Sequence, residues 1–170
     1  GCFGERKTFR SRYEVASSTP LQMLVYFNIF ASCIWGIGWI LLFNWKVSVW
    51  DAPIYVIIVV PVMYFAWAVI EPIRLALGYL GNLHERVAWL GPFIILTVAP
   101  QMVVHIFFLV GQSLMGWFTL EIELIFSLGF FLLYIVQIVV AWQTSKRFIS
   151  KAAGEFELQP VSEIVSEIYS

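Results

Sequence analysis

Four long stretches of the chain lack charged residues and consist mainly of aliphatic and aromatic side chains. A helix needs about 20 apolar residues to cross the hydrocarbon core of a bilayer, and three of the stretches suit one crossing each. The third in order has 34 residues between Arg86 and Glu121, which is too long for one crossing and too short for two. We assign to it one helix and then an interfacial segment through Gly111, Gly116 and Trp117. The pattern predicts an all-α fold, a four-helix transmembrane bundle with spans at about 21–43, 52–80, 87–110 and 122–145.

The amino-acid composition also points to an integral membrane protein. Hydrophobic residues make up 61% of the 170 residues and charged residues 12%, and the mean hydropathy is +0.85. A soluble core of this size cannot bury that much apolar surface. The net charge of −1 provides no electrostatic footprint for a nucleic acid, and two cysteines are too few for a disulfide framework or a four-cysteine zinc site. Composition therefore excludes a soluble enzyme, a disordered protein and a nucleic-acid binder.

Basic residues are distributed unevenly between the two predicted sides of the membrane. Nine of the ten flank the N-terminal segment, the turn between the second and third spans, or the C-terminal segment, and only Lys46 lies on the other side. Because cytoplasmic segments carry the excess of Lys and Arg, both termini and the middle turn are predicted to be cytoplasmic. We divide the chain into a basic N-terminal segment 1–20, a membrane domain 21–145 and a C-terminal tail 146–170. The nine residues are Arg6, Lys7, Arg10, Arg12, Arg74, Arg86, Lys146, Arg147 and Lys151.

No arrangement of residues suggests catalysis, and we assign no catalytic, cofactor-binding or metal-binding residue. The one aspartate, Asp51, lies at a predicted boundary between a span and a loop. The two histidines, His84 and His105, are 21 residues apart, which on one helix separates them by about 31 Å. They cannot bind one haem or one metal ion within a single chain.

Two charged residues at the end of the second span, Glu71 and Arg74, are three residues apart and therefore share one helical face. Their spacing predicts an ion pair. Because the uncharged stretch ends at Ile70, we place this pair near the cytoplasmic headgroups, where it anchors the second helix. The alternative is that it docks lipid headgroups or the tail of a partner protein.

The polar residues that we predict deep in the spans are neutral. They are Asn28, Gln101, Gln137 and His105. Hydrogen bonds between helices are the usual role of such residues within a membrane. A second interpretation is that Gln101, His105 and Gln137 form the polar lining of a small channel or transporter subunit, since Pro92 and Pro100 interrupt the third span.

The turn between the second and third spans has polar and small residues at its centre. Gly81 and Asn82 tolerate left-handed backbone conformations, so we expect the chain to reverse there. The result is a helical hairpin with charged residues at its tip. At the other extreme of the sequence, Gly1 and Cys2 are candidates for N-myristoylation and palmitoylation.

Three segments resemble the transmembrane protein 17 family of ciliary tetraspan proteins. Residues 21–28 are similar to the start of the family's domain, and residues 156–159 to its end. The hallmark lies at the middle turn, where polar residues recur at fixed spacing. The hallmark residues that we take as candidates for interaction or structure are Glu71, Arg74, Gly78, Tyr79, Gly81, Asn82, Glu85 and Arg86.

The resemblance implies a non-enzymatic four-span protein of the ciliary membrane, concentrated at the transition zone. In that family, members join the Meckel-type gate complex with tectonic-like proteins and sibling tetraspans. It implies a hetero-oligomer that contacts membrane lipids and binds no nucleic acid. The channel or transporter subunit, or an accessory subunit of another membrane complex, stays as the alternative.

Overall fold

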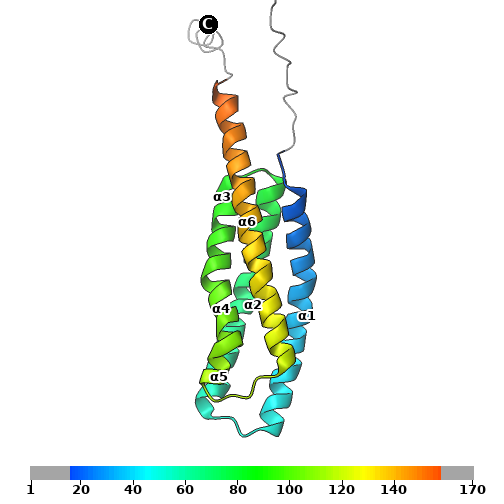
Figure 1. Cartoon of the computed structure of the whole chain (residues 1–170), viewed down its shortest axis with the longest axis vertical. Coiled ribbons are helices and arrows are strands. Elements are labelled where there is room, and N and C mark those ends of the chain that lie inside the picture. Colours follow the sequence, from blue (N-terminus) through cyan, green and yellow to red (C-terminus); the bar gives the residue numbers. More distant parts are fainter. Residues whose placement is uncertain (1–15, 158–170) are drawn as a thin grey trace, which may run out of the picture.

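The computed structural model describes residues 16–157, with side chains through residue 154, and it consists of helices without a strand in that range. Four helical segments are long and apolar enough to cross a membrane, so the predicted all-α, four-span fold is confirmed. They run nearly parallel in one elongated bundle (Figure 1). The four segments are α1 (Thr19–Val49), α2 (Ile54–Leu83), a third span (Val87–Leu114) and α6 (Glu121–Glu157).

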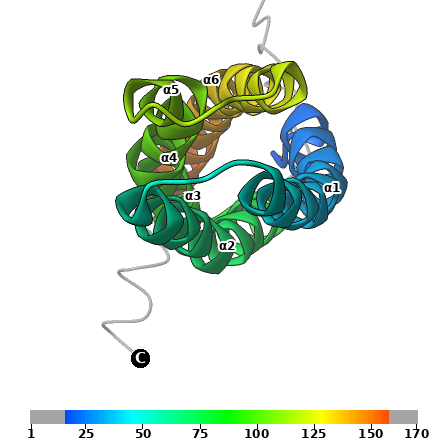
Figure 2. The same cartoon turned by 90° about the horizontal axis from the view of Figure 1, so that it is seen from below.

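The four spans form a ring when the bundle is seen from one end (Figure 2). α1 packs against α2 and α6, and the third span packs against α2 and α6 on the other side. The turn between α2 and the third span, residues 84–86, defines what we call the hairpin end. The start of α1 and the C-terminal part of α6 lie at that same end (Figure 1). The connections 50–53 and 115–120 define the opposite loop end.

The helices are longer than a membrane crossing requires. α1 has 31 residues, α2 has 30 and α6 has 37. At 1.5 Å per residue, α6 is about 55 Å long, and it extends past the hairpin turn. α1 begins at an N-cap, because the side chain of Ser18 accepts a hydrogen bond from the backbone N–H of Leu21. α2 continues to Leu83, well beyond the charged residues at which its uncharged stretch stops.

The third span is one irregular helix. It comprises α3 (Val87–Leu96), α4 (Met102–Ile106) and α5 (Gln112–Leu114), which are joined by two π-helical turns, Thr97–Gln101 and Phe107–Gly111. Ala99 leaves the helical conformation (φ −141°, ψ 114°) because it precedes Pro100, and the residue before a proline is disfavoured in the α region.

The helix of the third span continues past the predicted end at about Val110. Gly111 belongs to the span, which continues to Leu114. Trp117, which follows the span, is 5% exposed and packs into the apolar core. Gly116 has φ +72°, a conformation that favours glycine, and it turns the chain so that Trp117 points inward.

The reversal at the hairpin end also differs from the prediction. Gly81 and Asn82 are helical, and the left-handed residue of the turn is Glu85 (φ 53°). Gly81 has a packing role instead. A Cβ atom there would lie 2.8 Å from Leu90 Cδ1 and 3.1 Å from Leu90 N, and one at Gly78 would lie 2.7 Å from the Phe93 ring. These two glycines allow α2 and α3 to approach closely.

Two apolar clusters fill the bundle, and a polar layer separates them. The loop-end cluster includes Trp35, Trp67, Val104 and Tyr134, and the hairpin-end cluster includes Val25, Leu75, Phe93 and Ala141. On each span, one or two of the buried polar residues fall between a member of one cluster and a member of the other. They are Asn28 and Ser32 on α1, Glu71 and Arg74 on α2, Thr97 and Gln101 on the third span, and Gln137 on α6.

Candidate functional site

The centre of the polar layer is the ion pair between Glu71 and Arg74 on α2. The guanidinium donates two parallel hydrogen bonds to the carboxylate, Nη2 to Oε1 at 2.7 Å and Nε to Oε2 at 2.9 Å. Glu71 is 2% exposed and Arg74 is 0% exposed. The predicted i,i+3 pairing therefore occurs, in the bidentate geometry that gives a guanidinium–carboxylate pair its strength.

Side chains from α1 bind the carboxylate of this pair. Asn28 Nδ2 donates to Glu71 Oε1 at 3.1 Å, and Ser32 Oγ donates to the same oxygen at 2.9 Å. The two donors are four residues apart, so they lie on one face of α1, toward the bundle axis. Glu71 thereby has hydrogen-bond donors from a second span as well as from its own.

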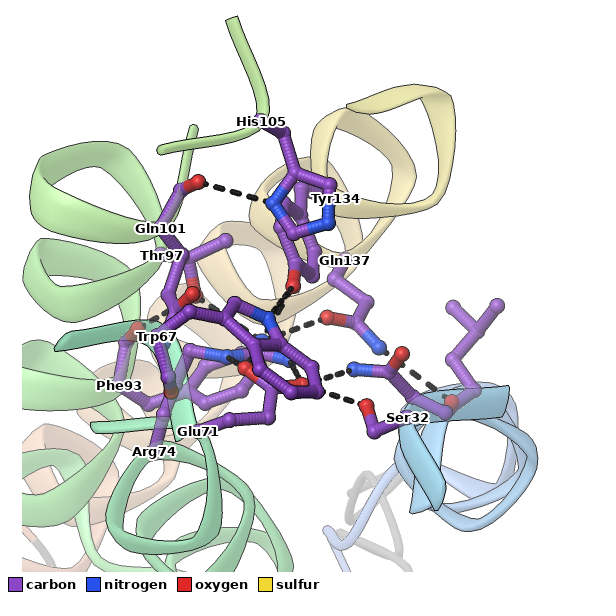
Figure 3. A network of polar contacts seen from close by, with 12 residues as sticks. Ser32, Trp67, Glu71, Arg74, Phe93, Thr97, Gln101, His105, Tyr134 and Gln137 are labelled. Atoms are coloured by element: carbon purple, nitrogen blue, oxygen red, sulfur yellow. Dashed lines mark hydrogen bonds and ion pairs between the residues drawn. The ribbon is translucent and has the colours of Figure 1, made fainter. Parts of the chain in front are cut away.

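The third span and α6 bind the guanidinium. Arg74 Nη1 donates to Gln137 Oε1 at 2.8 Å and to Thr97 Oγ1 at 3.2 Å. The Arg74 Cζ atom also lies 4.6 Å from the centroid of the Tyr134 ring, a cation–π contact. Figure 3 shows these side chains converging from all four spans. We call the set the charged network; it comprises Asn28, Ser32, Glu71, Arg74, Thr97, Tyr134 and Gln137.

A second set of polar side chains continues the network toward the loop end. The Tyr134 hydroxyl lies 3.5 Å from Glu71 Oε2 and 3.5 Å from Trp67 Nε1. Gln101 Nε2 donates to the backbone oxygen of Trp67, and His105 Nδ1 lies 3.1 Å from the backbone oxygen of Gln101. These contacts join the third span, α2 and α6 around aromatic rings (Figure 3).

The interpretation of Glu71 and Arg74 as an anchor facing the headgroups is wrong. The pair is buried, and Glu71 is 12 residues from the end of α2, or about 18 Å along the helix. The prediction that the polar residues deep in the spans are all neutral is also wrong, because this buried pair is charged. An uncharged stretch ends by definition at its first charge, so it locates a span boundary too early where a span contains an internally paired charge.

The buried pair is stable only as a complete unit. An isolated charge in an apolar interior is costly, but a paired charge whose other lone pairs and protons are hydrogen-bonded is tolerated. Each partner here has a counter-ion and polar contacts from other spans. The chemical consequence is a specific connection among four helices, which lipid-facing apolar packing alone does not provide.

The remaining hallmark residues lie at the hairpin end, away from the charged network. Asn82 Oδ1 accepts from the backbone N–H of Ser18 at 2.8 Å, and Asn82 Nδ2 donates to the Ser18 oxygen at 2.9 Å. Glu85 accepts from the backbone N–H of Ala16 at 2.6 Å and from Lys151 Nζ at 2.6 Å. We call Ser18, Asn82, Glu85 and Lys151 the hairpin clasp, since they tie the start of α1, the turn and α6 together.

The carboxyl of Glu85 has a perturbed pKa. Partial burial raises this pKa, but the hydrogen bond and charge of Lys151 and the N–H groups of Ala16 and Ser17 outweigh that effect. The net result is a pKa below the ordinary value of 4.5. Glu85 therefore stays ionised at neutral pH, as its contacts require.

Four of these remaining hallmark residues are outside the clasp: Gly78 and Gly81, which pack against α3, and Tyr79 and Arg86. Tyr79 is 39% exposed on the outside of α2. Arg86 is exposed, and its Cζ atom lies 5.6 Å from the centroid of the Trp89 ring. Gly1 and Cys2, the lipidation candidates, lie outside the described residues.

A third polar group, at the loop end, escaped prediction. Lys46 Nζ lies 2.9 Å from Glu123 Oε2 and 3.4 Å from Gln112 Oε1, and all three residues are buried. It connects α1 with α6 and the third span. The only sequence signal was that Lys46 is the one basic residue on its side. Within residues 16–154, no group of three His, Cys, Asp or Glu side chains could hold a metal ion.

Comparison with known proteins places these features in a family. A family model described as "Predicted membrane protein", Transmemb_17, matches residues 23–134, which contain the hallmark and the charged network's α2 pair. The chain belongs to the transmembrane protein 17 family. The predicted membership of this family is thus confirmed. No solved structure matches the chain.

Relatives in several vertebrates match most of the chain. Transmembrane protein 17 of Gallus gallus is 36% identical over 88% of this chain and 69% of its own length. The Homo sapiens protein is 33% identical over 86% of this chain and 71% of its own. Transmembrane protein 17B of Xenopus tropicalis is 30% identical over 96% of this chain and 73% of its own length. The protein is therefore a multi-pass membrane protein of this family.

Proposed function

We propose that this protein is a non-enzymatic assembly component of a ciliary membrane complex, concentrated at the transition zone. The observation that carries the proposal is the charged network, in which polar side chains from all four spans bind one another. Side chains that bind one another in this way hold the four helices together and have a structural role. The outer surface of the spans is exposed and available to other molecules.

That outer surface is apolar over long helical faces. Ile34, Leu41, Phe65 and Ile125 are each more than 60% exposed in the single chain. Within a membrane such faces contact lipid tails or the helices of other proteins. We infer that tectonic-like membrane proteins and sibling tetraspans pack against them in a hetero-oligomer, as membership of the family leads us to expect.

Localisation of the tagged full chain in ciliated cells tests the proposal. We expect enrichment at the ciliary base and recovery of other multi-pass membrane proteins on mild detergent purification. Uniform plasma-membrane or mitochondrial signal would contradict the ciliary role. Recovery of a different membrane complex would support the alternative of an accessory subunit there.

A channel or transporter subunit is the second candidate, and the broken third span favours it. Non-helical backbone within a membrane occurs where a segment is buried in protein or lines a cavity. In this bundle, however, Gln137 binds Arg74 and the backbone of Leu24, and Gln101 binds the backbone of Trp67. Ion or solute flux in liposomes that contain the purified chain would favour this candidate over assembly.

A further inference from the structure

The two ends of the bundle differ in the exposed charges that they carry. Three of the basic residues between positions 16 and 154 have carboxylate partners, namely Lys46, Arg74 and Lys151. The other three are exposed and make no ion pair within that range. They are Arg86, Lys146 and Arg147.

These three side chains belong to one layer, at the hairpin end. Arg86 precedes α3, and the neighbouring Val87 packs with the hairpin-end cluster that contains Phe148. Lys146 and Arg147 directly precede Phe148 on α6, and Glu85 of the turn binds Lys151 one turn further along. The loop end has the opposite character, because Asp51 and Glu121 are exposed there.

Two of the three cations sit over indole rings. Arg86 Cζ lies 5.6 Å from the Trp89 ring centroid, and Lys146 Nζ lies 5.5 Å from the Trp142 ring centroid. The exposed His84 adds a ring 5.6 Å from Trp89. Tryptophan is enriched at the level of the lipid headgroups, where its apolar ring and polar N–H both find suitable surroundings. Cations that lie over such indoles are therefore suited to the level of the lipid headgroups.

We propose that the hairpin end binds anionic phospholipid headgroups through Arg86, Lys146 and Arg147, with Trp89 and Trp142 fixing the depth of two of these cations. A headgroup phosphate with net negative charge is complementary to this layer, and each basic residue near a charged membrane surface adds attraction. The opposite end, with exposed carboxylates, gains nothing from such lipids. This selectivity stands independently of the ciliary role.

Lipid selectivity is measurable on the full chain reconstituted in phosphatidylcholine bilayers. Trace spin-labelled phosphatidylglycerol or spin-labelled phosphatidylcholine reports which lipid is immobilised at the protein surface. At low ionic strength we expect the anionic label to associate about two- to fivefold more strongly than the zwitterionic one. In 1 M salt the preference for the anionic label should fall sharply, since the Debye screening length is then about 3 Å.

Charge variants locate the preference. R86Q/K146Q/R147Q should lower the ratio of the two labels toward one. D51N/E121Q, which removes exposed charges at the loop end, is the matched control and should leave the ratio unchanged. R86K/R147K keeps the charge and should retain most of the preference.

Two results would overturn the proposal. One is a triple variant with the selectivity of the unmodified chain. The other is an unmodified chain without selectivity at low salt. That result would favour an acidic protein segment, and not a lipid, as the ligand of the basic residues at the hairpin end. The salt titration of the unmodified chain tests the selectivity even if a variant fails to fold.

Discussion

The charged network and the hairpin clasp both join segments that are far apart in sequence, yet they lie in very different surroundings. In the network, the Arg74 and Glu71 side chains are 0% and 3% exposed, and contacts come from all four spans. In the clasp, Lys151 and Glu85 are 33% and 23% exposed. Removing one partner of a buried pair costs about 3–5 kcal/mol, whereas exposed pairs contribute about 0–1 kcal/mol. The two ion pairs therefore contribute unequally to stability, and the loss of a partner costs more in the buried pair.

The largest effect should follow the loss of one partner from the charged network. Glu71→Ala leaves the Arg74 guanidinium buried without its counter-ion, and we expect a loss of about 3–5 kcal/mol in the free energy of unfolding. Unfolding by SDS in mixed micelles, followed by tryptophan fluorescence, measures this. Ile73→Ala is the matched control, because Ile73 is exposed on the same helix. Equal losses in the two variants would contradict the special weight given to the buried pair.

An intermediate effect should follow closure of the gap between α2 and α3. Gly81→Ala places a methyl group against Leu90, and overpacking of this kind costs about 1–3 kcal/mol. Gly129→Ala on α6 is the control, since a Cβ there meets no atom within 4 Å. In the same unfolding assay the control should lose nothing. If Gly81→Ala is as stable as that control, close packing does not explain the glycine.

The smallest effect should come from the clasp. Glu85→Gln keeps acceptors for the N–H groups of Ala16 and Ser17 but loses the charge that faces Lys151, so we expect a loss of about 1 kcal/mol or less. The folded pKa of Glu85 lies below its ordinary value. Its contribution is therefore complete above the unfolded pKa and disappears as the pH falls through the folded pKa.

This pH dependence gives the clasp a direct test. Unfolding of the unmodified chain and of Glu85→Gln at pH 7 and at successively lower pH should show a difference that shrinks with acidification. A difference that is constant with pH would mean that the carboxylate charge is not what binds Lys151.

Sequence reasoning predicted the kinds of contact better than their depth. The spacing of Glu71 and Arg74 predicted their pairing, and Asn28 and Gln137 were expected to bond between helices, as they do. The depth of the pair was missed because hydropathy treats every charge as a boundary. Whether a charge is solvated or internally paired depends on residues of other helices, which a local pattern does not contain.

Contacts between residues far apart in the sequence could not be predicted either. Lys46 and Glu123 are 77 residues apart, and nothing local to either residue indicates the other. The sequence predicts a turn at Gly81 and not a packing role. Its need for close approach depends on Leu90 across the α2–α3 interface. The predicted side of the membrane for the termini stays a prediction, and accessibility labelling from each side would test it.

A double-mutant cycle on Glu71 and Arg74 tests the central claim most directly, namely that the charged network acts as one structural unit. The free energy of unfolding is measured for the unmodified chain, E71A, R74A and E71A/R74A. If the network is one unit, the double variant should lose about 2–3 kcal/mol less than the sum of the two single losses, since neither charge remains unpaired. Losses that add to within about 0.5 kcal/mol would contradict the claim.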